Sequence, residues 1–177
     1  MSSCFKNYPA VNEDANAKSK SFNFKTDLSF LDRTMLKQLV EFGQKEKQNA
    51  RISLHTSPEN ALHNMIIMQL KGTYNRPHKH VLKAEAYHLI HGEQKVIIFD
   101  NEGGIRESCR MSARGRFIYR FEKNLFHMSI PLSDIVVFHE SKTGPFIRQG
   151  DSVYPNWAPE TDEPDKINRF MKSLEAS

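Results

Sequence analysis

The sequence predicts an all-β domain, a barrel or a sandwich, with one helix near each end of the chain. Short apolar runs in the middle of the chain are separated by turn-rich stretches, which is typical of the strands of such a fold. Apolar residues at helical spacing occur in two places, one before these runs and one after them. With 177 residues, of which 38% are hydrophobic, the chain can form one core, and no internal repeat divides it.

The first 26 residues are polar and show no period, so we expect a tail there. A helix is expected to follow, with Asp27 or Ser29 as its N-cap and its end within residues 44–48. Its apolar stripe consists of Leu31, Met35, Leu36, Leu39 and Val40. This helix carries no catalytic spacing, and we expect it to pack against the barrel.

The apolar runs that we expect to be strands span residues 51–55, 65–70, 94–99, 116–121 and 135–138. Turn signals occupy residues 56–60 and 100–104. A second helical stripe, with Ile167, Phe170, Met171 and Leu174, follows Pro164. These patterns predict a tail over residues 1–26, a barrel with its leading helix over 27–160, and a helical extension over 161–177.

Composition narrows the class of protein. The chain has 25 Lys and Arg against 21 Asp and Glu, and a net charge of +4, which favours anionic ligands such as sugar nucleotides. The basic residues are scattered without interleaved aromatics, so we expect no nucleic-acid binding. No run of eighteen apolar residues indicates a membrane span, and the first residues lack a secretory apolar segment. We therefore expect a cytoplasmic protein.

The most informative segment is residues 72–92. It contains His78 and His80, two residues apart, and Glu85 five residues later, with Gly72 and Gly92 at its ends. Imidazole and carboxylate groups are ligands of first-row metals. Side chains at i and i+2 of a strand share a face, so both histidines can point at one ion. Glu85 can reach the same ion if the chain bends between residues 80 and 85.

This segment matches every fixed position of G-x5-H-x-H-x4-E-x6-G, and so resembles the first signature motif of the cupin superfamily. The resemblance implies a double-stranded β-helix, a jelly-roll barrel, with a metal inside. It also implies a fourth ligand from a second motif, P-x-G-x2-H, for which His127 is the candidate. Glu122 stands at the proline position and Asn124 at the glycine position. Asparagine tolerates the left-handed turn that glycine usually makes.

The expected metal ligands are thus His78, His80, Glu85 and His127, with His139 as the rival of His127 for the fourth position. Three imidazoles and one carboxylate suit one divalent transition metal, and Zn, Fe, Mn, Ni and Co are all compatible. Such a set leaves coordination positions open for water or substrate.

Strand alternation predicts further groups inside the barrel. Arg76 shares the parity of His78, and Tyr87 shares that of Glu85. A buried arginine needs an anionic partner, either a protein carboxylate or a group of the ligand. Tyr87 is the candidate acid or hydrogen-bond donor, with core filling as the alternative. Lys83 lies in the expected bend, where it could bind an anion.

Residues from about 28 to 160 resemble the WbuC-type cupin-fold metalloproteins. The likeness is carried by residues 50–55, residues 72–80, Lys83, Glu85, Phe99-Asp100, residues 144–146 and residues 157–159. It implies a bacterial protein associated with O-antigen or other surface-polysaccharide biosynthesis. It also points to Arg51, His55, Arg76, Lys83 and Trp157 as residues to test, with Arg51, Arg76 and Lys83 as the substrate-binding candidates.

Two functions of different class follow from these residues. The first is a metal-dependent enzyme of the isomerase or epimerase type that acts on a sugar or sugar nucleotide, with an Fe(II) dioxygenase as a variant. The second is a non-catalytic sensor or binding barrel that holds a small molecule beside a structural metal. Either would bind a small, anionic sugar derivative, and analogy with other cupins allows a homodimer.

Overall fold

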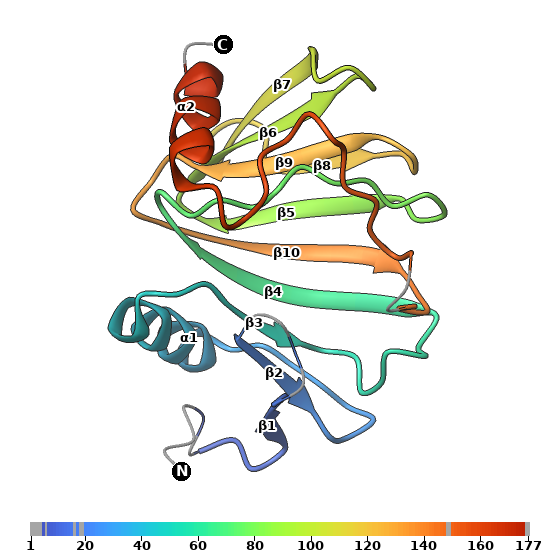
Figure 1. Cartoon of the computed structure of the whole chain (residues 1–177). Coiled ribbons are helices and arrows are strands. Elements are labelled where there is room, and N and C mark those ends of the chain that lie inside the picture. Colours follow the sequence, from blue (N-terminus) through green and yellow to red (C-terminus); the bar gives the residue numbers. More distant parts are fainter. Residues whose placement is uncertain (1–4, 6, 16, 18–19, 148–149, 176–177) are drawn as a thin grey trace.

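The computed structural model describes residues 5, 7–15, 17, 20–147 and 150–175 of the chain. Within these residues, ten strands form two sheets, and one helix lies on the outside of each (Figure 1). In chain order the elements are β1 (Val11–Glu13), β2 (Lys20–Phe24), α1 (Arg33–Glu46), β3 (Ala50–Ser53), β4 (Leu62–Leu70), β5 (Glu85–His91), β6 (Glu93–Phe99), β7 (Ile105–Ser112), β8 (Ile118–Phe121), β9 (Phe126–Pro131), β10 (Ile135–Thr143) and α2 (Pro164–Glu175).

The larger sheet has seven strands in the order β1-β2-β3-β4-β10-β5-β8, and the smaller has three in the order β7-β6-β9. All pairs are antiparallel except β2 with β3. In the large sheet, Lys142 on β10 lies opposite Glu85 on β5 and opposite His63 on β4. This register brings interior residues of three strands to one end of the barrel.

Apolar residues of both sheets fill the space between them. The buried members of this core are Tyr87, Leu89, Val96, Ile98, Cys109, Met111, Phe121, Val136 and Phe138. They follow the period of two that a strand with one interior face requires. On β10 the interior positions are the even ones, so Glu140 and Lys142 continue the row that Val136 and Phe138 begin.

Each helix closes a second core on the outer face of a sheet. Met35 and Leu39 of α1 are fully buried against Ile52, Ile66 and Met68 of β3 and β4. Helix α2 packs Leu174 and Phe170 on the outer face of the small sheet. The two helices predicted from the apolar stripes are confirmed, and so is the all-β class.

The predicted N-cap of the first helix is wrong. Helix α1 begins at Arg33, and the side chain of Asp32 accepts a hydrogen bond from the backbone N–H of Met35 at 2.7 Å. Asp32 is the residue that satisfies the free N–H groups of the first turn, as an N-cap does. Asp27 and Ser29 lie outside the helix, in the connection from β2.

The N-terminal segment is also more ordered than the sequence predicts. Residues 11–13 and 20–24 form β1 and β2 at the edge of the large sheet, where an aperiodic tail was expected. Phe22 and Phe24 are buried against the core beneath α1. Two phenylalanines at alternate positions were the signal for this strand.

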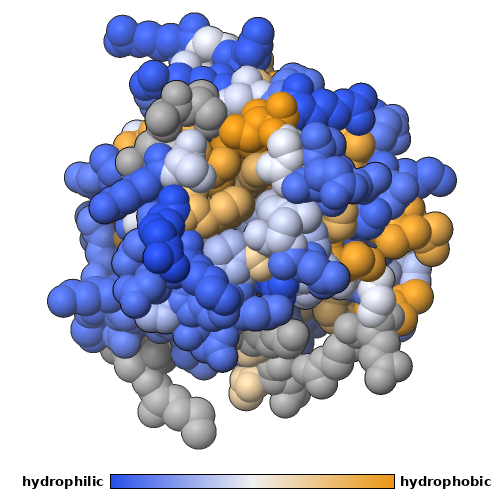
Figure 2. Space-filling model, turned by 45° about the horizontal axis from the view of Figure 1, so that its top comes forward, coloured by the Kyte–Doolittle hydropathy of each residue, from blue (hydrophilic) through white to orange (hydrophobic). Residues whose placement is uncertain are grey.

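The face of the molecule shown in Figure 2 is mostly hydrophilic, with hydrophobic patches between the charged side chains. In the part of the chain that the structure describes, neither helix has the length and apolar character needed to cross a membrane.

Candidate metal centre

The segment with His78 and His80 has an extended backbone and pairs with β9 at the edge of the small sheet. The backbone N–H of His78 donates to His127 O at 3.1 Å, and the N–H of His127 donates back to His78 O at 2.9 Å. Lys79 makes the same pair of bonds with Val153, both at 2.9 Å. The two histidines therefore share one face, as their spacing predicts, and their ring centroids are 5.1 Å apart.

The chain then bends at residues 81–82, so that Glu85 opens β5 in the other sheet. His127 arrives on β9 after a turn in which Asn124 has a φ of 63°. The N–H of Asn124 donates to His80 O at 2.7 Å, which ties this turn to the first histidine segment. Asparagine thus takes the left-handed conformation expected of it there. The candidate site joins the two sheets at one end of the barrel.

Three imidazoles converge at this point. One ring nitrogen from each of His78, His80 and His127 lies within 4.8 Å of the others. Each Nδ1 faces a backbone carbonyl: Arg76 O at 3.1 Å, Asp151 O at 2.5 Å and Leu125 O at 2.9 Å, respectively. A carbonyl only accepts, so each Nδ1 carries a proton and Nε2 is the nitrogen of each ring that can bind an ion. This is the arrangement by which proteins fix the tautomer of metal-binding histidines.

Glu85 lies among the three rings. Its Oε1 is 3.0 Å from Nε2 of His80, and its Oε2 is 3.1 Å from Nε2 of His127. Neither buried Nε2 has an aligned hydrogen-bond partner among the described residues. Two ligand atoms about 2.1 Å from one ion and at right angles to each other lie about 3.0 Å apart, so these contacts fit a shared ion. The residues present therefore fit a divalent metal with nitrogen and oxygen ligands.

The pKa values of His78 and His80 are shifted in opposite directions, and the shift of His80 shows the effect of the nearby carboxylates. Burial, with His127 and His80 nearby, lowers the pKa of His78 to about 3. Burial also opposes the charged form of His80, yet Asp151 and Glu85 raise its pKa to about 9. The pKa of Glu85 lies well below its usual range, because contacts with His127, His80 and Lys142 outweigh its burial. The cluster thus attracts a cation, and a bound metal ion would supply that charge.

Comparisons with known proteins agree with this architecture. A family model described as a domain of unknown function, DUF6016, matches residues 31–111. A search of curated proteins found no match. Among solved structures, the chain is similar to L-ribose isomerase from Cellulomonas parahominis, in complex with L-psicose, with 15% identity and a TM-score of 0.51. That similarity covers 62% of this chain and 70% of the isomerase.

Two further structures show the same similarity. Protein SO0799 from Shewanella oneidensis has 12% identity and a TM-score of 0.51, over 64% of this chain and 82% of that protein. CapF, in complex with 3-isopropenyl-tropolone, has 11% identity and a TM-score of 0.54, over 82% of this chain but only 34% of CapF. At such identities the similarity shows the fold alone. The chain has a cupin fold.

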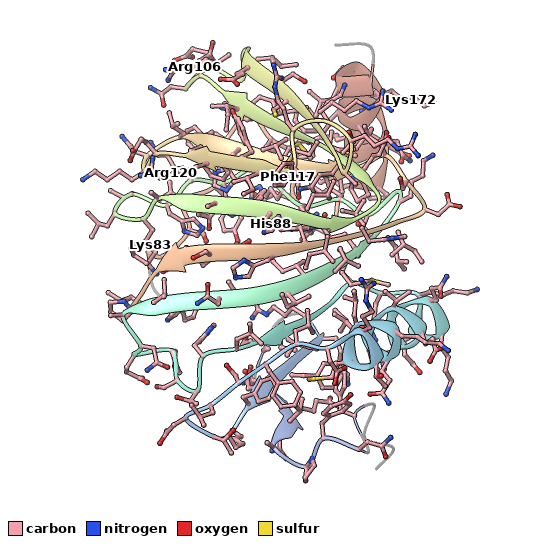
Figure 3. All side chains as sticks on the ribbon, turned by 180° about the vertical axis from the view of Figure 1, so that it is seen from behind. Lys83, His88, Arg106, Phe117, Arg120 and Lys172 are labelled. Carbon is pink, nitrogen blue, oxygen red and sulfur yellow. The ribbon has the colours of Figure 1, made fainter. Side chains whose placement is uncertain are left out.

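Asp151 is a residue of the candidate site that the sequence did not predict. Its carboxylate lies 3.3 Å from Nδ1 of His80, in addition to the bond from its backbone oxygen, and it forms an ion pair with Lys83. Both side chains are largely buried. Figure 3 shows Lys83 beside the end of β10, at the end of the barrel where the site lies. Asp151 follows Gly150 in an irregular segment, and no pattern in the sequence marks it.

Two other missed residues lie on β10. Lys142 Nζ is 3.3 Å from Glu85 Oε1 and 3.1 Å from Glu140 Oε1, and its side chain is 13% exposed. The apolar run in the sequence predicts a strand that ends at residue 138, but β10 continues to Thr143. Extending the same alternation by four residues would have placed both side chains inside the barrel.

The candidate catalytic residue, Tyr87, is buried in the core against Phe121 and Phe138. Its hydroxyl donates to Glu85 Oε2 at 3.4 Å, which is a long hydrogen bond. Burial and the nearby carboxylates raise its pKa well above the usual value. The ring of Tyr87 therefore fills the core and its hydroxyl lies beside Glu85, while its role as an acid stays a prediction.

The candidate substrate-binding arginines lie away from the imidazoles. Arg76 forms an ion pair with Glu160 and donates to Pro155 O at 3.1 Å and Ala158 O at 3.4 Å. Its anionic partner is thus a protein carboxylate of the segment after β10. Arg51 donates from Nε to Ser21 Oγ at 2.7 Å. Within the described residues, neither guanidinium group contacts the three histidines, and Arg76 reaches His78 only through its backbone oxygen.

The remaining histidines and the tryptophan have structural contacts. His139 Nε2 donates to Asn64 Oδ1, 2.9 Å away, so His127 and not its rival joins the cluster. His88 lies opposite His139 on the outer face of the sheet (Figure 3). His55 stacks on His63 with ring centroids 4.1 Å apart. Trp157 packs on Phe99, at a centroid distance of 5.0 Å, outside the barrel.

Two hollows on the described surface contain no candidate metal ligand. One, of about 450 Å³, lies between the 101–102 turn and residues 154–157. The other, of about 440 Å³, lies between residues 27–29 and residues 54–64. In the candidate metal centre itself, His80, Glu85 and His127 are each 2–3% exposed, and His78 is partly exposed.

Proposed function

We propose that this cupin is a metal-dependent enzyme of the isomerase or epimerase type that acts on a sugar or sugar nucleotide. The proposal is supported by the convergence of three imidazoles, each held at Nδ1 by a backbone carbonyl so that its Nε2 can bind an ion. His78, His80 and His127 would hold the metal, with Glu85 as the fourth ligand. When bound, a divalent ion supplies Lewis-acid polarisation of a keto or hydroxyl oxygen.

The other residues have roles that follow from their contacts. Tyr87 is the proposed proton donor, because its hydroxyl oxygen lies 3.4 Å from Glu85 Oε2 and donates a hydrogen bond to it. Lys83 is proposed to bind substrate at the mouth, since it is partly buried beside Asp151 and above the ring of Phe146. Arg51 and Arg76 remain proposed substrate contacts, although Arg76 must then exchange Glu160 for the ligand.

The sequence resemblance to WbuC-type proteins supports a finer proposal. The proposed setting of the reaction is bacterial surface-polysaccharide biosynthesis, including that of O-antigen, in the cytoplasm. A structure with the same fold is an L-ribose isomerase in complex with L-psicose, which supports sugar isomerisation by analogy.

One observation favours the alternative of a non-catalytic binding barrel with a structural metal. Three of the four candidate ligands, His80, Glu85 and His127, are buried, and the hollows beside residues 101–102 and 27–29 contain none of the four. An enzyme needs a path for its substrate, which residues 150–160 would have to open. An Fe(II) dioxygenase is the third candidate, and the identity of the metal separates it from the Lewis-acid enzyme.

The test follows solvent hydrogen in the substrate. The protein, loaded separately with Zn(II), Mn(II), Co(II) or Fe(II), is incubated in D2O with a panel of aldoses, ketoses and sugar nucleotides. An isomerase or epimerase of this type replaces a C–H proton beside the carbonyl or hydroxyl carbon with deuterium, which NMR detects. His127→Ala should lose this exchange and His139→Ala should keep it. Stoichiometric metal without exchange on any sugar would favour the binding barrel, and O2 consumption with Fe(II) alone would favour the dioxygenase.

A further inference from the structure

Lys142 is a buried ammonium group at the centre of the candidate site. It lies on the interior face of β10, opposite Glu85 on one neighbouring strand and His63 on the other. Its Nζ contacts Glu85 Oε1 at 3.3 Å and Glu140 Oε1 at 3.1 Å. Lysine is among the residues that proteins bury least, and it is buried only with a partner or a task. None of the roles proposed above uses it.

A bound metal ion changes the charge around Lys142. Lys142 contacts the carboxylates of Glu85 and Glu140, and Lys83 contacts that of Asp151. With a divalent ion on three neutral histidines, these three carboxylates and two ammonium groups have a net charge of +1. Unbalanced charge is costly at this depth, so the loaded site favours one further negative charge.

The ammonium group of Lys142 has an N–H that can donate a hydrogen bond to a further anionic group. Lysine offers three N–H donors, and the two carboxylates account for two of them. The described residues provide no further partner for the third. Because Lys142 contacts Glu85, a group that binds an ion beside Glu85 comes within reach of Nζ. Charge-assisted hydrogen bonds of this kind are roughly twice as strong as neutral ones.

We propose that Lys142 determines specificity for a carboxylate substrate, by holding one oxygen of that carboxylate beside the metal. This inference rests on the proposed metal site and narrows its substrate to a sugar acid or other hydroxy acid. A carboxylate fits because it brings one negative charge, which matches the +1 of the loaded site. A phosphate monoester carries a charge of about −1.5 to −2 at pH 7 and would make the net charge of the metal-loaded site negative.

A purely structural role for Lys142 predicts the opposite change in metal affinity. If Lys142 only holds Glu85 in place for the metal, Lys142→Met should weaken metal binding. If Lys142 serves an anion, removing its charge should leave metal binding unchanged or stronger, because the ammonium and the ion repel each other across Glu85. The two roles are therefore separable in the same variant.

The experiment uses the full chain loaded with Co(II), with glycolate as the probe and ethylene glycol as its neutral counterpart. The Co(II) absorption spectrum and calorimetry follow probe binding, and competition with a chelator measures metal affinity. The wild type should bind glycolate at least 10-fold more tightly than ethylene glycol. Lys142→Met should lower glycolate affinity at least 10-fold, change ethylene glycol less than 3-fold and not weaken Co(II) binding. Lys142→Arg should restore part of the glycolate affinity.

Glu140→Gln is the second variant, and it acts in the other direction. It removes one carboxylate from Lys142, so glycolate should bind at least 3-fold more tightly, whether or not Lys142→Met folds. Equal binding of the two probes by the wild type, unchanged glycolate affinity in Lys142→Met, or weaker glycolate binding in Glu140→Gln would each overturn the inference. A wild-type protein that takes up no metal overturns the proposed function itself, and this result precedes any probe measurement.

Discussion

The backbone oxygen of Asp151 accepts a hydrogen bond from Nδ1 of His80 at 2.5 Å across 71 residues of sequence. The carboxylate of the same residue lies 3.3 Å from that nitrogen and pairs with Lys83. Asp151 thus orients the imidazole from behind and raises its basicity, as a second carboxylate often does at a metal site. The segment after β10 is therefore part of the candidate centre.

This contact gives the first prediction. Asp151→Asn keeps the backbone bond but removes the negative charge behind His80, so metal affinity should fall about 10-fold. Chelator competition with Zn(II) measures the change. The matched control is Asp162→Asn, an exposed position of the same segment, which should leave the affinity unchanged. Equal affinities for Asp151→Asn and the wild type would show that the carboxylate does not act on His80.

Arg76 should fasten the same segment. Arg76→Ala loses an ion pair with Glu160 and bonds to two backbone oxygens, which should lower the free energy of unfolding by about 1–3 kcal/mol. Glu160→Ala removes only the exposed partner and should cost less than about 1 kcal/mol. Urea unfolding of both single variants and the double variant measures the coupling. If the stability of Arg76→Ala equals that of the wild type while its binding of an anionic probe weakens, Arg76 contacts the ligand and does not hold this segment in place.

Gly144 should tolerate no side chain where this segment leaves β10. A Cβ at this position would lie 1.8 Å from the backbone oxygen of Asn60 and 2.7 Å from Nε2 of His63. A backbone atom cannot move aside, so we expect Gly144→Ala to destabilise the fold by about 1–3 kcal/mol or more. Gly115→Ala is the control, because its nearest neighbour is the movable hydroxyl of Ser112. Thermal melting of the two variants should differ by several degrees, and equal melting temperatures would contradict the packing.

The stacked pair His55 and His63 should make stability depend on pH. Burial and the neighbouring His63, with Arg51 and Lys142, lower the pKa of His55 from 6.5 to about 4. Burial also lowers the pKa of His63. Between pH 6.5 and 4 the unfolded chain therefore binds more protons than the folded one, so stability falls as the pH falls through this window.

His55→Asn tests this dependence. Melting temperatures are compared at pH 7 and pH 5 in EDTA, so that metal release does not contribute. The wild type should lose more stability than His55→Asn over this interval. An identical loss in both proteins would assign the pH dependence to other groups.

The local patterns of the sequence were enough to predict much of this molecule. The stripes of Leu39 and Leu174 predicted both helices, and the spacing of His78 and His80 predicted a shared face. These features depend only on residues near each other in the chain. Phe22 and Phe24 also alternate as the residues of a strand do, but two apolar positions among polar residues were too short a pattern to predict one.

The partners of the site could not be predicted in the same way. Asp151 reaches His80, and Arg76 reaches Glu160, only because the chain returns over the small sheet after β10. Such contacts depend on the path of an irregular segment, for which periodicity gives no information. The position of Lys142 could be predicted in part, because strand alternation places it inside the barrel once β10 is known to continue to Thr143.

The metal content of the protein tests the central claim most directly. The wild type, His78→Ala and the control His139→Ala are purified without chelator or affinity metal and measured by elemental mass spectrometry. We expect close to one equivalent of iron, manganese, nickel, cobalt or zinc in the wild type and in His139→Ala, and its loss in a folded His78→Ala. No metal in the wild type even after reconstitution, or equal metal in all three proteins, would contradict the account.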